Sequence, residues 1–181
     1  MIEEILEYNK EFVKEKKYEE FCTDKYPNKK VAVLSCMDTR LTHLLPAALG
    51  LKNGDAKVIK NAGAQINNDY GSIVKSLLVA IYELGVKEIL VIGHDDCGIQ
   101  ELDAKKMIDK MIARGIDPKE IERIDKEECA LEPYLSGFRD INHSVCSTVR
   151  HLLKHPLMPK DITVVGLIMD PHTGEIRLAK E

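Results

Sequence analysis

The sequence predicts a single α/β domain, built on a mostly parallel central sheet of four strands plus a short edge strand, with helices on both faces. Short apolar, β-branched runs alternate along the chain with longer segments of helical period. This alternation is typical of a parallel sheet covered by its connecting helices. The 181 residues are enough for one compact domain and few for two. Because no internal repeat or linker interrupts the pattern, residues 1–181 are interpreted as one domain.

Three of the runs have the character of buried strands, because a parallel strand is covered on both faces and is apolar throughout. We expect these strands at Val31–Ser35, Glu88–Gly93 and Ile162–Met169. A fourth strand is expected at Lys57–Lys60, before the turn-prone residues Asn61-Ala62-Gly63. The sequence DPHTG at residues 170–174 is typical of a turn, and it leads into the short edge strand, Glu175–Leu178.

The segments between the strands indicate helices. Residues 1–20 carry a narrow apolar stripe on a charged background, which predicts an amphipathic helix that must lie against something. Apolar residues occupy nearly every face from Gly71 to Leu84, and Gly85 is placed as a helix C-cap. Residues 99–135 are charged and helical in period, with breaks near Gly115 and Pro118, and Ile141–Leu153 forms another amphipathic helix.

Composition excludes several classes of function. Lys and Arg number 26 against 30 Asp and Glu, a formal net charge of -4, whereas nucleic-acid binders show a basic surplus. The longest apolar runs fall far below the roughly 18 residues that cross a bilayer. The N-terminus is acidic and lacks an apolar signal region, so we expect a cytoplasmic protein. Five irregularly spaced cysteines fit reduced thiols or metal ligands better than disulfides.

Two thiols and an imidazole follow two of the expected strands. Cys36 comes directly after the first strand, and His94 and Cys97 follow the third. Ligands of open parallel sheets bind outside the carboxyl ends of the strands, and thiolate and imidazole are the ligands that zinc prefers. Three protein ligands with an open position are typical of a catalytic zinc. The fourth position then holds either water or the nearby Asp38.

The motif after the first strand also carries a carboxylate and a guanidinium. In an extended segment alternate side chains share a face, so Cys36, Asp38 and Arg40 are expected to point the same way while Met37 and Thr39 point into packing. A guanidinium can hold a carboxylate away from a metal through a bidentate pair. With Arg40 disengaged, Asp38 could bind zinc and close the site.

These residues carry a family resemblance. The motif C-x-D-x-R after one strand and H-x-x-C-G after another, with Lys60-Asn61-Ala62-Gly63 between them, resembles the β-class carbonic anhydrases of the small prokaryotic branch. The resemblance implies reversible hydration of CO2 to bicarbonate and a proton by zinc-bound hydroxide. It implies one Zn2+ per subunit on Cys36, His94 and Cys97, and a catalytic Asp38–Arg40 dyad. It also implies a homodimer or higher homo-oligomer, with the helix of residues 1–20 packing on a partner subunit.

Two other functions remain open at this point. A hydrolase for CS2 or COS would use the same zinc scaffold, and a non-catalytic zinc-binding protein would need the three ligands but not the Asp38–Arg40 pair. The substrate pocket is expected beside the motifs, at Gly63, Ile66, Val79 and Gly98.

Several other polar residues have alternative roles. His43 is a candidate for proton transfer, against the commoner role of a surface residue. Asp95 and Asp96 either cap a helix that begins near Gly98 or support the metal-ligand histidine. His151 and His155 lie four residues apart on a helix, but the acid of a zinc-protease motif is missing between them.

Overall fold

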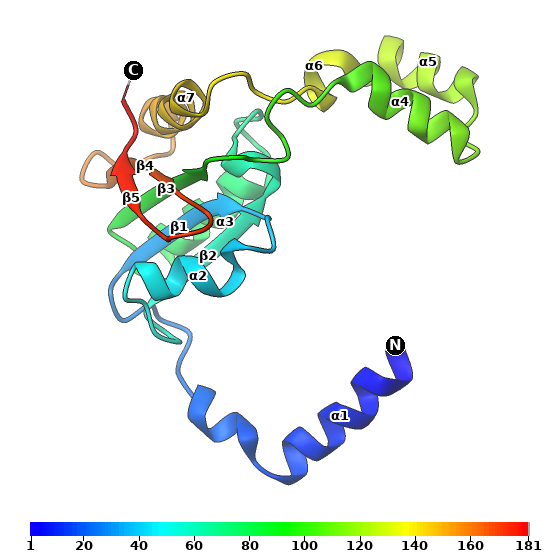
Figure 1. Cartoon of the computed structure of the whole chain (residues 1–181). Helices are drawn as coiled ribbons and strands as arrows, with labels where there is room; N and C mark the ends of the chain where they lie inside the picture. The colour runs from blue at the N-terminus through cyan, green and yellow to red at the C-terminus, as the bar shows by residue number, and fades with distance from the viewer. Residues whose placement is uncertain (181) are drawn as a thin grey trace.

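The computed structural model describes residues 1–180, which form an α/β fold with a long N-terminal arm (Figure 1). Its elements are α1 Ile2–Lys14, η1 Lys17–Phe21, β1 Val31–Cys36, α2 Leu41–Ala48, β2 Ala56–Asn61, η2 Ala62–Ala64, α3 Ser72–Tyr82, β3 Glu88–His94, α4 Ala104–Ala113, α5 Pro118–Glu127, α6 Leu131–Leu135, α7 Ile141–Lys154, β4 Thr163–Met169 and β5 Ile176–Leu178.

The sheet confirms the predicted fold class. Across residues 1–180 the strands form one five-stranded sheet in the order β2-β1-β3-β4-β5. The β1–β2, β1–β3 and β3–β4 pairs are parallel, and only the short edge strand β5 runs antiparallel, with Ile168 opposite Arg177. Because β1 and β3 are adjacent and parallel, their carboxyl ends meet at one edge of the sheet.

Helices cover both faces of the sheet, as the sequence predicts. The alternation along β1 sends Ala32 and Leu34 into a core cluster with residues of α3 and α7, such as Leu77 and Val145. On the opposite face Val33 packs with residues of α2. Every residue of β1 is buried, which accounts for its apolar sequence.

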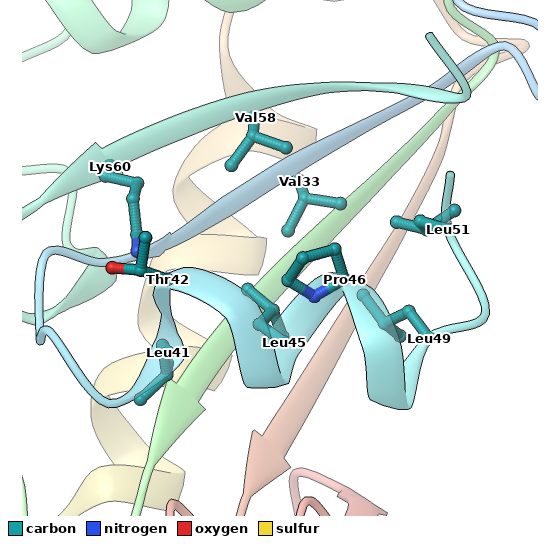
Figure 2. A pocket seen from close by; sticks show the side chains of 9 residues that line it. All are labelled: Val33, Leu41, Thr42, Leu45, Pro46, Leu49, Leu51, Val58 and Lys60. Carbon is teal, nitrogen blue, oxygen red and sulfur yellow. The ribbon is translucent and has the colours of Figure 1, made fainter. Parts of the chain in front are cut away.

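Helix α2 is absent from the elements that the sequence predicts. It has only eight residues, contains Pro46 and lacks a side-chain cap at its start, so the usual signals of a helix are missing. Between α2 and the edge strand β2 lies an apolar hollow of about 200 Å³. Figure 2 shows its lining, in which Leu45, Pro46 and Val58 are joined at one end by Thr42 and Lys60.

The predicted helix of residues 1–20 is broken into two parts. Helix α1 ends at Lys14, and η1 follows after Lys16, whose φ of 55° is left-handed. Figure 1 shows this arm projecting away from the sheet. No residue of α1 or η1 is buried within the described chain, and Ile2, Ile5 and Leu6 are all more than half exposed.

Residues 99–138 leave the domain as a helical excursion that contains α4, α5 and α6 (Figure 1). The predicted break near Gly115 and Pro118 is confirmed, since α4 ends at Ala113 and α5 begins at Pro118. Backbone hydrogen bonds join the two ends of the excursion, from Glu101 N–H to Phe138 O at 2.8 Å and from Gly137 N–H to Leu102 O at 3.0 Å.

Among residues 1–180, no helix combines the length and apolar character needed to span a membrane.

Candidate metal centre

Three buried side chains converge where β1 and β3 end. Cys36 is the last residue of β1, His94 is the last residue of β3, and Cys97 follows three residues later. Their ligand atoms all lie within 4.8 Å of one another. Each side chain belongs to a residue that is at most 5% exposed. The structure thus brings together the three residues that the sequence predicts as metal ligands, because parallel neighbouring strands deliver them to the same edge.

The imidazole of His94 has one nitrogen free for a ligand. Its Nδ1 lies 2.8 Å from the carbonyl oxygen of Asp95, and since a carbonyl only accepts, Nδ1 carries the proton. The Nε2 atom is buried and has no hydrogen-bond partner among the described residues. A buried polar atom without a partner is costly, and a metal ion bound at Nε2 would remove that cost.

The two thiols fit the same ion. Their sulfurs are 3.8 Å apart, and a tetrahedral zinc with Zn–S bonds of about 2.3 Å holds two sulfurs at about this separation. The hydrogen bond between the two sulfurs lowers the pKa of Cys36 to about 4. The same hydrogen bond, with burial, raises the pKa of Cys97. A group of this chemistry suits zinc.

Asp38 and Arg40 form the predicted pair, but by a different local structure. Arg40 donates from Nη2 to Asp38 Oδ2 at 2.8 Å and from Nε to Oδ1 at 3.0 Å. The chain turns after Asp38 instead of continuing extended: the backbone N–H of Arg40 also donates to Asp38 Oδ1 at 2.8 Å, and Leu41 N–H bonds to Asp38 O at 3.2 Å. Such an Asx turn brings the two side chains together.

The extended segment predicted here is therefore wrong beyond Asp38. The same turn exposes the two side chains that were expected to be packed, since Met37 is 61% exposed and Thr39 is also exposed.

Asp38 stands beside the ligand cluster as an ionised carboxylate. Its Oδ2 lies 3.8 Å from Nε2 of His94. The hydrogen bonds from the Arg40 side chain lower the pKa of Asp38 to about 2. Asp38 can therefore accept a hydrogen bond in this site at any pH near neutrality.

Arg40 also binds the loop that carries the other ligands, a contact that the sequence pattern did not indicate. It donates from Nη1 to Asp96 Oδ2 and from Nη2 to Asp96 O, both at 2.8 Å. Neither Asp95 nor Asp96 caps the next helix, because α4 begins at Ala104 and is capped by Asp103. The capping alternative is thus wrong.

A hollow of about 360 Å³ opens beside the cluster. It is lined by Cys36, Met37, Asp38, Thr39, Arg40, Gly98 and Ile99. A second hollow shares Met37 and Ile99 with it and extends towards Asn61, Gln65 and Tyr134. Sequence reasoning missed Met37 and Ile99, whose only signal was their place next to the motifs.

The other residues singled out from the sequence lie at various distances from this hollow. Gly98 lines it, and Gly63 is buried in η2. Ile66 packs in the core. Val79 is 44% exposed on α3 and does not line the hollow. His43 is likewise exposed, on α2.

His151 and His155 lie together elsewhere in the fold. His151 pairs with Asp69 at 2.6 Å, and His155 Nε2 lies 2.9 Å from Asp69 O.

Comparison with known proteins gives the family. A model of the carbonic anhydrase family matches residues 31–176. YtiB of Bacillus subtilis (strain 168), which carries the provisional name of carbonic anhydrase, is 45% identical over 178 residues, 98% of this chain and 95% of that protein. A carbon disulfide hydrolase of Acidithiobacillus thiooxidans is 30% identical over 158 residues, 83% of this chain and 77% of that protein.

Solved structures agree. The β-carbonic anhydrase isoform I of Trichomonas vaginalis superimposes with a TM-score of 0.88 at 36% identity, covering 99% of this chain and 97% of that one. A carbonic anhydrase of Streptococcus mutans gives a TM-score of 0.73 at 30% identity, over 96% of this chain and 98% of that one. The family model, the two Bacillus relatives and the solved structures agree with the sheet and with the cluster of two cysteines and a histidine. The chain therefore belongs to the β-class carbonic anhydrases, a family of enzymes.

Proposed function

We propose that this chain catalyses the reversible hydration of CO2 to bicarbonate, with one Zn2+ per subunit held by Cys36, His94 and Cys97. One observation carries the proposal: the buried, unpartnered Nε2 of His94 faces two thiols, and a carboxylate held by an arginine stands 3.8 Å away. A merely structural ion needs no such carboxylate, so this arrangement favours a catalytic centre over a zinc-binding protein without activity.

Zinc held by these ligands would supply a Lewis acid that lowers the pKa of water towards neutrality. Asp38 would orient the attacking water. Its Oδ1 already accepts two hydrogen bonds from Arg40, whereas Oδ2 accepts one from Nη2. Each carboxylate oxygen has two lone pairs, so Oδ2, which faces His94, keeps one lone pair for the O–H group of the water. Arg40 holds this carboxylate ionised and away from the ligand cluster.

The hollow beside the cluster suits a small linear substrate. Met37 and Ile99 give it an apolar lip, and Gly98 adds a wall without a side chain. Carbon dioxide has no net charge or dipole, so apolar contacts are enough to admit it.

The direct test is a stopped-flow assay of CO2 hydration on the zinc-loaded chain, with the metal-free chain as the blank. Cys146→Ser is a matched control for the ligand variant Cys36→Ser, because Cys146 lies on α7 outside the cluster. Activity that requires zinc and Cys36 but not Cys146 supports the proposal. A chain that binds one zinc per subunit and hydrates no CO2 would exclude it.

Hydrolysis of CS2 or COS is the second candidate. Relatives named carbon disulfide hydrolase match over 83% of the chain at 30% and 28% identity, and these linear apolar molecules resemble CO2 in shape. The 45% identity to YvdA and YtiB favours CO2. CS2 and COS run alongside CO2 in the same assay decide between them by the ratio of kcat/KM values.

We also propose that the chain, one domain over residues 1–181, works as a homodimer or higher homo-oligomer. Helix α1 has no buried residue, and its stripe of Ile2, Ile5 and Leu6 is exposed. Apolar faces of this kind are typical of interfaces. A second copy of the chain would cover the stripe, with residues 1–20 as the oligomerisation helix.

We place the protein in the cytoplasm, where thiols such as Cys36 and Cys97 stay reduced and able to bind metal.

A further inference from the structure

The edge strand β5 reaches the ligand loop through an arginine. Arg177 donates from Nη1 to Asp95 Oδ2 and from Nη2 to Asp95 Oδ1, both at 2.7 Å. This is a bidentate pair, which fixes the orientation of a carboxylate as well as its position. The two side chains are 47% and 40% exposed. Because exposed ion pairs contribute little to stability, the geometry of this pair calls for another explanation.

Asp95 is the residue whose backbone holds His94. Its carbonyl oxygen accepts the Nδ1 proton of His94 at 2.8 Å, and its N–H donates to Met169 O, at the end of β4, at 3.0 Å. The next residue, Asp96, has a left-handed φ of 50°. A non-glycine residue keeps such a conformation where its surroundings determine it, and Arg40 binds Asp96 on the other side of the loop.

We propose that Arg177 and Asp95 form a positioning pair for His94. The direction of the Asp95 carbonyl depends on the backbone angles of that residue. By holding the Asp95 carboxylate, the bidentate pair restrains these backbone angles. A fixed carbonyl keeps the proton on Nδ1 and leaves Nε2 free for the metal. Partners of this kind outside the ligand set orient a ligand histidine and strengthen metal binding. The inference rests on the proposed function, because it requires zinc at His94.

The test measures zinc affinity by competition with a chromophoric chelator. Arg177→Gln should weaken zinc binding on the order of 10-fold. The matched control is Arg123→Gln, since Arg123 makes a similar surface pair with Glu120 on α5, far along the chain from the ligands. The control should bind zinc as the unaltered chain does. Arg177→Lys should recover part of the loss, because lysine keeps the charge without the fork.

A double-mutant cycle and the imidazole itself separate positioning from general destabilisation. Asp95→Asn should weaken binding like Arg177→Gln, and the double variant should be no worse than either single one. If Arg177→Gln does not fold, the zinc affinity of Asp95→Asn tests the proposal by itself. In NMR spectra of the zinc-loaded chain, the Nδ1 proton of His94 should exchange with water faster in both single variants than in the unaltered chain.

The outcomes are distinct. Zinc affinity within twofold of the unaltered chain in Arg177→Gln and Asp95→Asn, or fully additive losses, would overturn the positioning pair alone. An unaltered chain that binds no zinc would overturn the proposed function and this inference with it.

Discussion

Removing the guanidinium of Arg40 should inactivate the enzyme while leaving its metal in place. Arg40→Ala deletes two side-chain hydrogen bonds to Asp38 and two to Asp96. The substitution leaves the three proposed zinc ligands unchanged. What changes is the freedom of the Asp38 carboxylate, which then competes for the fourth coordination position.

Asp38 already lies close to the distance at which it could join the three ligands. Its Oδ2 is 3.8 Å from Nε2 of His94, and two ligands of one tetrahedral zinc with bonds of about 2.1 Å would be about 3.4 Å apart. Without Arg40 the carboxylate would therefore be free to compete for the metal. Losing two charge-assisted hydrogen bonds shifts the balance towards ligation on the order of 10- to 100-fold, and activity should fall by a similar factor.

The assay compares three chains: the unaltered one, Arg40→Ala, and Arg40→Ala with Asp38→Ala. Stopped-flow CO2 hydration gives the activity, and metal analysis gives the zinc content. We expect one zinc per chain in all three, the lowest activity in the single variant, and a partial recovery in the double variant, which has no carboxylate to close the site.

The recovery is the decisive result. A double variant no more active than Arg40→Ala would show that the pair acts by orienting water, and the idea that Arg40 keeps Asp38 off the metal would fail. Loss of zinc from the single variant would refute the reasoning in another way, because it would give Arg40 a part in metal retention.

Three further results are expected. Cys97→Ser should lose stoichiometric zinc by metal analysis, since a neutral hydroxyl cannot replace a thiolate; full retention with intact activity would remove Cys97 from the ligand set. Deleting residues 1–20 should weaken self-association in sedimentation, and an unchanged oligomer would contradict the role given to α1. The unfolding free energy lost in Arg40→Ala should be constant above about pH 4 in urea titrations. It should shrink as the pH falls towards 2, because the pKa of Asp38 is lowered from 3.8 to about 2; a loss that is independent of pH would contradict the pairing.

Local pattern was enough to predict the sheet and the ligand cluster. The strands read as apolar runs because both faces of β1 and β3 are covered. Cys36 and His94 stand at strand ends, and the parallel order of neighbouring strands places strand ends side by side. The chemistry of thiols and imidazole then indicates a metal without further knowledge of the fold.

Contacts between distant residues could not be predicted in this way. Arg40 and Asp96 are 56 residues apart, and Arg177 and Asp95 are 82 apart. Both pairs depend on the sheet order and on the direction of β5. The turn at Asp38 was missed because alternation assumes an extended chain, whereas the carboxylate itself bonds the backbone of Arg40 and bends the segment.

The helical excursion has a consequence for how this enzyme can vary. Backbone hydrogen bonds join its two ends, and a side chain at Gly137 would collide with the carbonyl oxygen of Ile99. Lengthening a closed loop costs little free energy. Insertions or deletions between these two ends, around Gly115 for example, would therefore leave Ile99 and the ligand loop in place. The excursion is a natural position for grafting a tag or a second binding module onto a working catalyst.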